Sequence, residues 1–447
     1  MPFPSGFLWG AATASYQIEG GVSEGGRGES IWDRFSHTPG NVEDGATGDT
    51  ADDHYHRFGE DVDLMADLGL KAYRFSIAWP RVFPDGGGPL NQTGLDFYGR
   101  LVDRLLERGI TPMATLYHWD LPQALQDRQG GWVSRDTAGR FADYATAAFS
   151  ALGDRVGHWV TLNEPWVSAF IGHHEGRHAP GVRDLTSALR AAHHLYLGHA
   201  EAVASFRALG SPGEIGITLN LNPADPATER DEDERAAILC DGNLNRWFLD
   251  PLFRAGYPTD MVEHYGRLGA DLDFIRPGDL TAMAQPLDFL GVNYYFRNIV
   301  SASADGLGWD AERARVGDTD LSNIGWAITP DGLREILGRV RRDYTTLPTY
   351  VTENGIALDD TVGPDGVVHD PRRIDYLAGH FAAAEAAIAD GTDLRGYFVW
   401  SLLDNFEWSV GYRPRFGLVF VDFATQARIP KSSAAWYSGV IRGNGLG

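Results

Sequence analysis

Two glutamates stand at the ends of apolar runs that have the composition of buried strands. Glu164 ends the segment HWVTLNE, and Glu353 lies in the segment TYVTENG. Two carboxyl groups that flank one bond can divide a reaction between them, because one donates a proton while the other acts as nucleophile or base. Either glutamate alone could equally cap a helix or accept hydrogen bonds from loop amides. The pair therefore has to be considered with its neighbours.

The other apolar runs also end in polar or aromatic residues. Amide and carboxylate groups pair with hydroxyl groups, and indole rings stack on the C–H face of a sugar ring. Residues of these kinds are Gln17, Glu19, Arg74, His118, Trp119, Asn163, Asn293, Tyr294, Tyr295, Asn354, Trp400, Asp404, Glu407 and Trp408. As a set they favour a polyhydroxylated ring as the ligand.

Eight runs rich in β-branched and aromatic residues must position these side chains. They begin at Phe7, Lys71, Ile110, His158, Glu214, Leu287, Thr349 and Leu394. Their apolar centres are typical of strands covered on both faces. Between them, residues 55–68 and 95–106 repeat apolar residues at steps of three and four. Gly69 and Gly109 follow these stretches, which predicts helices that end there.

Eight alternating strand and helix units are the number that closes a (β/α)8 barrel, the TIM barrel of the α/β class. In such a barrel the carboxyl ends of the strands face one pocket, where the polar residues above would meet. The length beyond about 250 residues for a minimal barrel would lie in extended βα loops such as 84–94, 222–235 and 301–320. An open doubly wound sheet is the alternative, but the sequence lacks a GxGxxG after the first run and any Walker motif. We expect one catalytic domain over residues 1–447.

Composition and net charge disfavour some classes of binding partner and indicate a cellular compartment. A net charge of -23 disfavours nucleic acid and acidic membrane surfaces, and no run reaches about 18 apolar residues. The single cysteine, Cys240, excludes an intrachain disulfide and is expected to be a buried small hydrophobe. With no signal-peptide pattern at the start, a cytoplasmic protein is expected. Lys71 and Lys431, the only lysines, are expected at the surface.

The chain resembles glycoside hydrolase family 1, the β-glucosidase family, from FLWGAATASYQIEG at Phe7 to RIPKSSAAWY at Arg428. TLNEP and VTENG are similar to that family's two catalytic signatures, and YHWDLP, GVNYY and NFEW occur in the same order. The resemblance implies a TIM barrel and a retaining β-glucosidase that needs no metal or cofactor. Its substrates would carry a terminal β-D-glucosyl residue, and also a β-fucosyl or β-galactosyl residue, as in cellobiose degradation.

By this resemblance Glu164 is the general acid and base, and Glu353 is the nucleophile. With Glu353 ionised and the carboxyls about 5 Å apart, a protonated Glu164 is favoured. The implied sugar-binding residues are Gln17, His118, Trp119, Asn163, Glu407 and Trp408, with Trp400 stacking on the ring. The residues implied near the nucleophile or the 2-hydroxyl are Arg74, Asn293 and Tyr295, and those on the aromatic walls and aglycone side are Phe416, Trp166 and Trp326.

Two departures from related subgroups refine this expectation. Plant thioglucosidases, which resemble the pattern, have Gln where Glu164 stands, so an O-glycosidase is favoured. Phospho-glycosidases have small hydroxylic residues and a lysine near Glu407 and Trp408. The carboxylate here is expected to repel a phosphate and to accept hydrogen bonds from free 4- and 6-hydroxyls.

Two other functions compete with a β-glucosidase. His174, Glu175 and His178 match the HExxH pattern of zinc metalloproteases, which requires both histidines on one face of a helix. Gly176 within that segment, and Pro180 after it, would make the helix short and poor. A loop at the pocket rim is therefore the expected structure. The second competitor is a sugar-binding barrel without activity, which the fold alone does not exclude.

Overall fold

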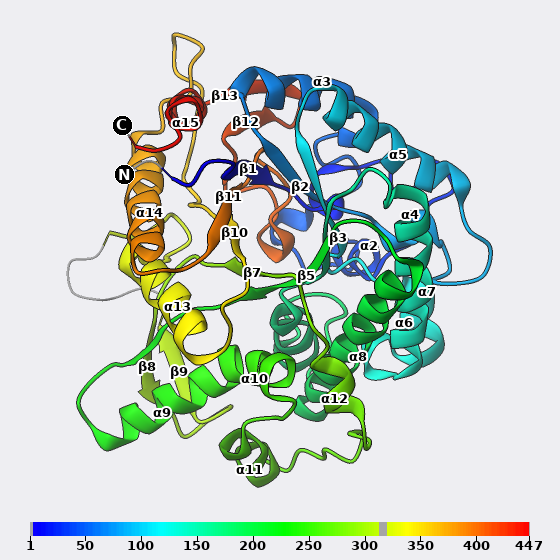
Figure 1. Cartoon of the computed structure of the whole chain (residues 1–447), viewed down its shortest axis with the longest axis vertical. Coiled ribbons are helices and arrows are strands. Elements are labelled where there is room, and N and C mark those ends of the chain that lie inside the picture. Colours follow the sequence, from blue (N-terminus) through cyan, green and yellow to red (C-terminus); the bar gives the residue numbers. More distant parts are fainter. Residues whose placement is uncertain (1–2, 313–319, 447) are drawn as a thin grey trace.

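The computed structural model describes residues 3–312 and 320–446. Eight parallel strands form a closed barrel in the order β1-β11-β10-β7-β5-β4-β3-β2 (Figure 1). These strands are β1 Leu8–Ala12, β2 Ala72–Ser76, β3 Thr111–Tyr117, β4 His158–Asn163, β5 Glu214–Asn220, β7 Phe289–Asn293, β10 Thr349–Asn354 and β11 Leu394–Trp400. Each lies within one of the eight runs expected from the sequence, so the predicted TIM barrel is confirmed.

Helices surround the barrel, as Figure 1 shows. The larger ones are α3 His54–Leu68, α5 Gln92–Glu107, α7 Asp136–Leu152, α8 Leu185–Leu209, α13 Pro330–Asp343, α14 Pro371–Ala389 and α15 Ser432–Gly443. Helix α3 ends where expected, because Gly69 adopts the left-handed conformation with φ of 81° that closes a helix without a steric penalty. Over the described residues, none of the helices combines the length and the apolar character that crossing a lipid bilayer would require.

A second layer lies beside the barrel between β5 and α13. It contains the three-stranded sheet β6-β8-β9, made of Ala224–Pro226, Asn298–Ala302 and Trp309–Glu312, with α9 (Asp231–Asp241) packed against it. Figure 1 shows α9, β8 and β9 together at the lower left. The same region holds a π-helix at Gly242–Arg246 and the helices α10 Trp247–Arg254, α11 Thr259–Arg267 and α12 Asp279–Met283. Residues 313–319 of the expected loop 301–320 lie outside the described residues.

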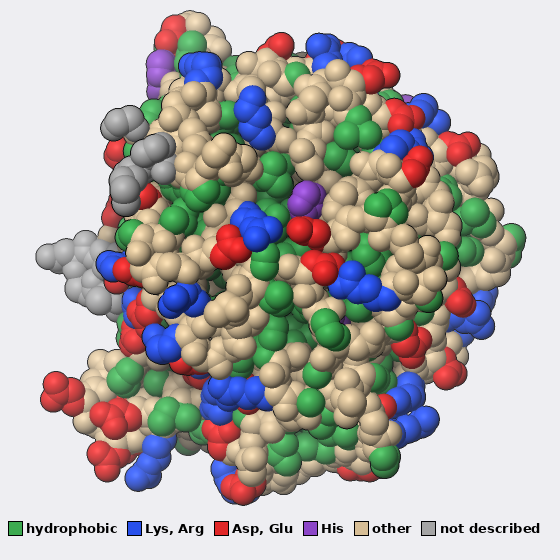
Figure 2. All heavy atoms as spheres, viewed as in Figure 1, with side chains coloured by type: hydrophobic (Ala, Val, Ile, Leu, Met, Phe, Trp, Pro, Cys, Tyr) green, Lys and Arg blue, Asp and Glu red, His purple; other side chains and the backbone are tan. Residues whose placement is uncertain are grey.

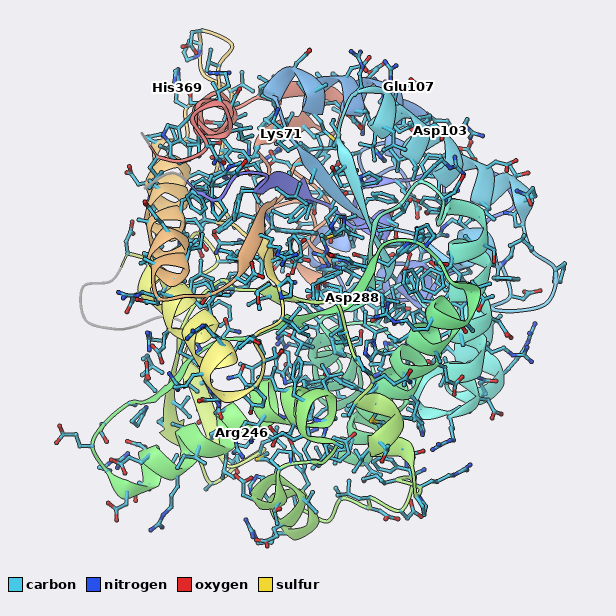
Figure 3. All side chains as sticks on the ribbon, in the orientation of Figure 1. Lys71, Asp103, Glu107, Arg246, Asp288 and His369 are labelled. Carbon is cyan, nitrogen blue, oxygen red and sulfur yellow. The ribbon has the colours of Figure 1, made fainter. Side chains whose placement is uncertain are left out.

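Short elements fill the remaining connections. They are α1 Ser15–Ile18, α2 Ile31–Ser36, α4 Trp79–Val82, α6 Gln123–Gln129, the antiparallel pair β12 Val419–Asp422 and β13 Ala427–Pro430, the 3-10 turns Glu43–Gly45, Gly131–Val133 and Trp408–Val410, and the π-helix Val167–Glu175. Figure 2 shows acidic and basic side chains interspersed over the face in view. Figure 3 labels Asp288 near the centre, and this residue directly precedes β7.

The expectation that both lysines lie at the surface is wrong for Lys431, although Lys71 is exposed. The Lys431 side chain is completely buried, with Nζ 2.6 Å from Asp360 Oδ2 and 2.6 Å from Asp404 Oδ1. Burial lowers the pKa of Lys431, and the two carboxylates compensate for the lost hydration. Because Asp360 follows β10 and Asp404 follows β11, the lysine ties together two loops at the carboxyl end of the barrel.

Candidate active site

A cavity of about 510 Å³ opens at the carboxyl end of the barrel strands. Of the residues expected in the site from the sequence, it is lined by His118, Trp119, Glu164, Trp166, Tyr295, Trp326, Glu353, Trp400, Glu407, Trp408 and Phe416. Four others, Gln17, Arg74, Asn163 and Asn293, are fully or almost fully buried and do not belong to the lining. Each of these four residues is within hydrogen-bond distance of a residue of the lining, so it lies directly beside the cavity.

Glu353 projects from β10 and is held by two donors. Its Oε1 accepts a hydrogen bond from Arg74 Nη1 at 2.6 Å, and its Oε2 accepts one from Tyr295 Oη at 2.8 Å. A Cβ atom built at Gly355, two residues further on, would lie 1.7 Å from the carbonyl oxygen of Trp400, so only glycine fits at this position. The glycine of the VTENG segment thus lets the last residue of β11 come close to the chain just after Glu353.

Glu164 directly follows β4 and is held by a different set of residues. Its backbone has φ of 45°, a left-handed conformation that a residue with a side chain adopts at an energetic cost. The Glu164 backbone N–H donates to Thr218 O at 2.9 Å, which helps to impose this conformation. The carboxyl Oε1 accepts a hydrogen bond from Asn293 Nδ2 at 2.7 Å. The side chain is thereby directed into the cavity.

The side-chain amide of Asn163 connects Arg74, which holds Glu353, with Asn293, which holds Glu164. Its Oδ1 accepts from Arg74 Nη2 at 2.6 Å and from Asn293 Nδ2 at 3.1 Å. Since the oxygen is used by these two donors, Asn163 Nδ2 must donate to His118 Nε2, which lies 3.0 Å away. His118 is then neutral with its proton on Nδ1. Burial and the Arg74 charge lower the pKa of His118 well below its usual value, in agreement with this assignment.

The two glutamates differ in what surrounds their charge. Burial, and next the Glu353 carboxylate, raise the pKa of Glu164 to about 8. Burial also raises the pKa of Glu353, but Arg74 and Tyr295 oppose that rise by stabilising the anion. The surroundings therefore favour the neutral form of Glu164, whereas Arg74 and Tyr295 favour the anionic form of Glu353. This is the combination that an acid and a nucleophile require.

Glu407 lies in the same cavity, beyond β11. Gln17 Nε2 donates to Asn405 Oδ1 and to Phe406 O, both at 2.9 Å, and is 3.4 Å from Glu407 Oε2. Burial and the Glu353 charge raise the pKa of Glu407 to about 8. The sequence predicts that the Glu407 carboxylate repels a phosphate group. This repulsion is weaker below that pH, because the carboxyl group is then mostly neutral. In either protonation state the carboxyl group keeps an oxygen that accepts hydrogen bonds.

Aromatic rings form two walls of the cavity. The first wall contains Trp119 and Trp408, whose ring centroids are 4.5 Å apart, and Trp400, which stacks on His118 at 5.8 Å. The second wall consists of Tyr295, Trp326 and Phe416, with centroid distances of 5.3 Å to 6.2 Å. Aromatic faces together with polar groups in one cavity suit a sugar ring, which has C–H faces and hydroxyl groups.

The sequence analysis missed several residues of the cavity. Asn220 ends β5, and Asn222 follows two residues later; both line the cavity. Asn220 occupies the same place on its strand as Asn163 and Asn293 do on theirs. The rule that polar strand ends face the pocket would therefore have found it. Other missed lining residues are Glu43, Val167, Ile171, Phe296, Asn323, Ile324, Ser409, Val410 and Arg413, whereas Arg177 and His178 belong to the segment expected at the pocket rim.

The HExxH segment does not form the helix that a zinc protease needs. His174 and Glu175 end a π-helix, Gly176 adopts φ of 69°, and His178 lies beyond the helix where it lines the cavity. Among residues 3–312 and 320–446, no three His, Cys, Asp or Glu side chains are grouped as metal ligands would be. The expected loop at the pocket rim agrees with this geometry.

Fold and site together define a glycoside hydrolase with a carboxyl pair. The model of the family described as glycosyl hydrolase family 1 matches residues 1–446, so the chain belongs to this family. β-Glucosidase A of Thermotoga maritima is 50% identical over 445 residues, which cover 99% of this chain and 98% of that protein. A bifunctional β-D-glucosidase/β-D-fucosidase of Bifidobacterium breve is 48% identical over 98% of this chain and 97% of its own.

Solved structures agree with this assignment. The T. maritima family 1 β-glucosidase in complex with isofagomine lactam has a TM-score of 0.95 and 49% identity, covering 100% of this chain and 99% of that one. The AHE enzyme from Alicyclobacillus herbarius has a TM-score of 0.96 and 50% identity, covering 99% and 98%. The resemblance to glycoside hydrolase family 1 noted in the sequence is confirmed.

Proposed function

We propose that the protein is a retaining β-glucosidase, which removes terminal non-reducing β-D-glucosyl residues from oligosaccharides or from aryl and alkyl glycosides. β-Fucosyl and β-galactosyl residues are further proposed substrates, and the relative from B. breve that is named for both β-glucosidase and β-fucosidase activity supports the first of them. The observation that carries the proposal is the pair Glu164 and Glu353, one favoured neutral and the other anionic, joined through Asn163 in a cavity with aromatic walls.

In the first step Glu353 attacks the anomeric carbon and forms an ester with it. The bond to the leaving oxygen breaks, and Glu164 donates its proton to that oxygen. Arg74 and Tyr295 hold the attacking carboxylate in place before the reaction. The products of this step are the free aglycone and the glycosyl-enzyme.

In the second step water attacks the same carbon from the side that the aglycone left. Once Glu353 is esterified its charge is gone, so one of the causes that raise the pKa of Glu164 disappears. Glu164 is then ionised and takes a proton from the water. The ester bond to Glu353 breaks as the water oxygen bonds to the carbon, which releases Glu353 as a carboxylate and leaves Glu164 protonated again. Two inversions give a β-configured product.

The sugar would bind between the walls. His118 lines the cavity, its Nδ1 has no hydrogen-bond partner among the described residues, and this side chain would bind a ring hydroxyl. Gln17 and Glu407 would bind the 4- and 6-hydroxyls, and Trp400 would stack on the ring. Asn163 and Asn293 would contact the 2-hydroxyl region. The remaining expected contacts are Trp119 and Trp408 for the sugar, Phe416 as an aromatic wall, and Trp166 and Trp326 for the aglycone.

The pH dependence of kcat/KM should report the two carboxyl groups of the free enzyme. Acid catalysis needs protonated Glu164, whose pKa is about 8, so kcat/KM should fall as pH rises through that value. Glu353 must be ionised, so kcat/KM should also fall at low pH, at a pH above the ordinary range for glutamate. The profile should be measured with an aryl β-glucoside from pH 4 to 10 in parallel with Glu164→Gln. If the fall in kcat/KM at high pH persists in Glu164→Gln, a group other than Glu164 causes it.

Glu407→Ala should change specificity as well as rate. If the carboxyl group accepts hydrogen bonds from the 4- and 6-hydroxyls in the transition state, kcat/KM for a β-glucoside should fall by the equivalent of about 2 to 4 kcal/mol. A β-fucoside lacks the 6-hydroxyl and should lose less. Glu407→Gln keeps an accepting oxygen and serves as the matched control. An unchanged ratio between glucoside and fucoside would remove this role from Glu407.

The proposed function is tested with five 4-nitrophenyl glycosides: the β-glucoside, β-galactoside, β-fucoside, α-glucoside and 6-phospho-β-glucoside. Turnover should be led by the β-glucoside or β-fucoside, with the α and phosphorylated substrates inactive. Sugar binding without any turnover would indicate an inactive barrel, and chelator-sensitive peptide hydrolysis would indicate a protease.

We further propose that residues 1–447 act as one catalytic domain and hydrolyse cellobiose in the cytoplasm. The single Cys240 suits that environment.

A further inference from the structure

Residues 404–417 form a loop beyond β11 that supplies part of the active-site cavity. Glu407, Trp408 and Phe416 belong to this loop, and all three line the cavity. A side chain on a loop keeps a fixed distance to a bound ring only if the surrounding structure holds the loop in place. The contacts that hold the 404–417 loop therefore bear on how Glu407 meets a sugar hydroxyl.

The Asp404 carboxylate joins the two ends of this loop. Its Oδ1 accepts a hydrogen bond from the backbone N–H of Gly417 at 2.9 Å, and its Oδ2 accepts one from Arg415 Nη1 at 2.8 Å. A Cβ atom built at Gly417 would lie 2.2 Å from the backbone nitrogen of Asp404, so the two ends approach this closely only with glycine there. The first and last residues of the loop are thus held together by one buried carboxylate.

Lys431 attaches that carboxylate to the outside of the barrel. It lies between β13 and α15, and its Nζ donates to Asp404 Oδ1 and to Asp360 Oδ2, both at 2.6 Å. Arg373 on α14 donates from Nη2 to Asp360 Oδ2 at 2.7 Å and to the carbonyl oxygen of Arg415 at 2.8 Å. Figure 1 shows α14 and α15 next to each other. The loop is therefore tied to both helices through buried charges.

The charges in this cluster balance. Three cationic side chains, Lys431, Arg373 and Arg415, meet three carboxylates, Asp360, Asp370 and Asp404. Buried ion pairs add little net stability, because the attraction between the charges is offset by the loss of their hydration. Their hydrogen bonds are directional, however, so they fix the relative positions of the segments that carry them. The clearest physical effect of the cluster is to set the position of the 404–417 loop.

We propose that Asp404 and Lys431 are positioning residues for the recognition of the 4- and 6-hydroxyls of the sugar, because they set where the loop places Glu407. The proposal rests on the proposed β-glucosidase function and on the role proposed there for Glu407. Asp404 and Lys431 are buried outside the cavity lining, so they act through the loop and do not touch the substrate. Their loss should weaken hydroxyl recognition and leave the chemistry of Glu164 and Glu353 unchanged.

The test compares the wild type with Asp404→Asn and Lys431→Met, each of which removes one charge at nearly constant volume. Asp61→Asn is the matched control, because Asp61 is equally buried and forms ion pairs with His54 at 2.7 Å and Arg428 at 2.9 Å, away from the 404–417 loop. The quantity measured is kcat/KM for 4-nitrophenyl β-glucoside and for its 6-deoxy analogue. These two substrates differ only in the 6-hydroxyl.

Both variants should lower the ratio of kcat/KM between the β-glucoside and the 6-deoxy-β-glucoside by about threefold to tenfold, as one lost hydrogen bond would. Asp61→Asn should keep the wild-type ratio even if it unfolds at a lower temperature. The fall in kcat/KM at high pH should stay where it is in the wild type, since Glu164 is not displaced. If Asp404→Asn and Lys431→Met keep the wild-type ratio, the proposal is wrong.

A double variant tests whether Lys431 acts through Glu407. Once Glu407→Ala has removed the carboxyl group, adding Lys431→Met should not change the ratio between the two glycosides any further. Two residues that act independently would instead give the product of their separate effects on the ratio. A ratio in the double variant equal to that product would overturn the proposal.

Folding is controlled separately, because removal of one partner from a buried ion pair destabilises a protein. Thermal unfolding of each variant is compared with that of the wild type. If neither buried variant folds, Arg415→Met decides the question. Arg415 is 19% exposed at its side chain and pairs with Asp404 Oδ2, so this milder change should lower the ratio in the same direction. A folded Arg415→Met with the wild-type ratio would then overturn the proposal.

Failure of the proposed function would look different. A wild type that hydrolyses neither glycoside would refute the β-glucosidase function itself. Active variants that all share the wild-type ratio would refute only the positioning role of Asp404 and Lys431.

Discussion

Glu353→Gly should lose turnover by on the order of 10⁴-fold to 10⁶-fold, as is typical when a nucleophile is removed. Added azide should restore cleavage of an activated aryl β-glucoside, because a small anion can enter the space that the carboxylate leaves beside Arg74 and Tyr295. The azide would attack from the α face in a single inversion. The product to be identified by NMR is therefore the α-glycosyl azide.

The matched control for this experiment is Glu353→Gln. The amide fills the same space but is a poor nucleophile, so this variant should be inactive and should not respond to azide. Both variants should bind glucose analogues, since the aromatic walls remain. Formation of the β-glycosyl azide in Glu353→Gly would assign the acid role to Glu353 and would reverse the proposed division between the two glutamates.

Glu164→Ala should show an effect that depends on the leaving group. Loss of general acid catalysis typically costs about 10²-fold to 10⁴-fold, and this loss should appear with poor leaving groups such as the glucose of cellobiose. A 2,4-dinitrophenyl leaving group needs no proton, so the glycosyl-enzyme should still form from it. Hydrolysis of that intermediate should be slow, because the base that activates water is also missing.

A burst of dinitrophenol followed by a slow steady state would reveal this behaviour in rapid-mixing experiments. Azide should accelerate the slow phase and give the β-glycosyl azide, the opposite anomer to that from Glu353→Gly. Glu164→Gln provides a control with nearly the same volume. Equal losses with good and poor leaving groups would show that Glu164 does not act as the acid.

The barrel and the two glutamates could be predicted because the signals that define them are local. Eight buried strands appear as apolar runs, and the residues at their ends share a pocket in any such barrel. Asn163 and Glu164 are adjacent in the chain, so the placement of one implied that of the other. Their partners Arg74 and Asn293 come from other strands; the pattern of polar strand ends placed them in the same pocket, and the resemblance suggested their role near the nucleophile or the 2-hydroxyl.

Features that depend on distant contacts could not be predicted. Lys431 appeared to be a surface residue because a lone lysine carries no local sign of burial, and its partners Asp360 and Asp404 come from two other loops. The sequence predicts loops in the segments that contain β6 and β9 of the sheet β6-β8-β9. These strands have three and four residues, which is too short for a periodic pattern.

The most direct test of the account is to trap the glycosyl-enzyme with a 2-deoxy-2-fluoro-β-glucoside that carries an activated leaving group. The fluorine slows both steps, and the good leaving group lets the first step outrun the second, so the intermediate accumulates. Peptide mapping by mass spectrometry should then find one sugar per chain, attached to Glu353. A label on Glu164, or full activity with no label at any residue, would contradict the proposed mechanism.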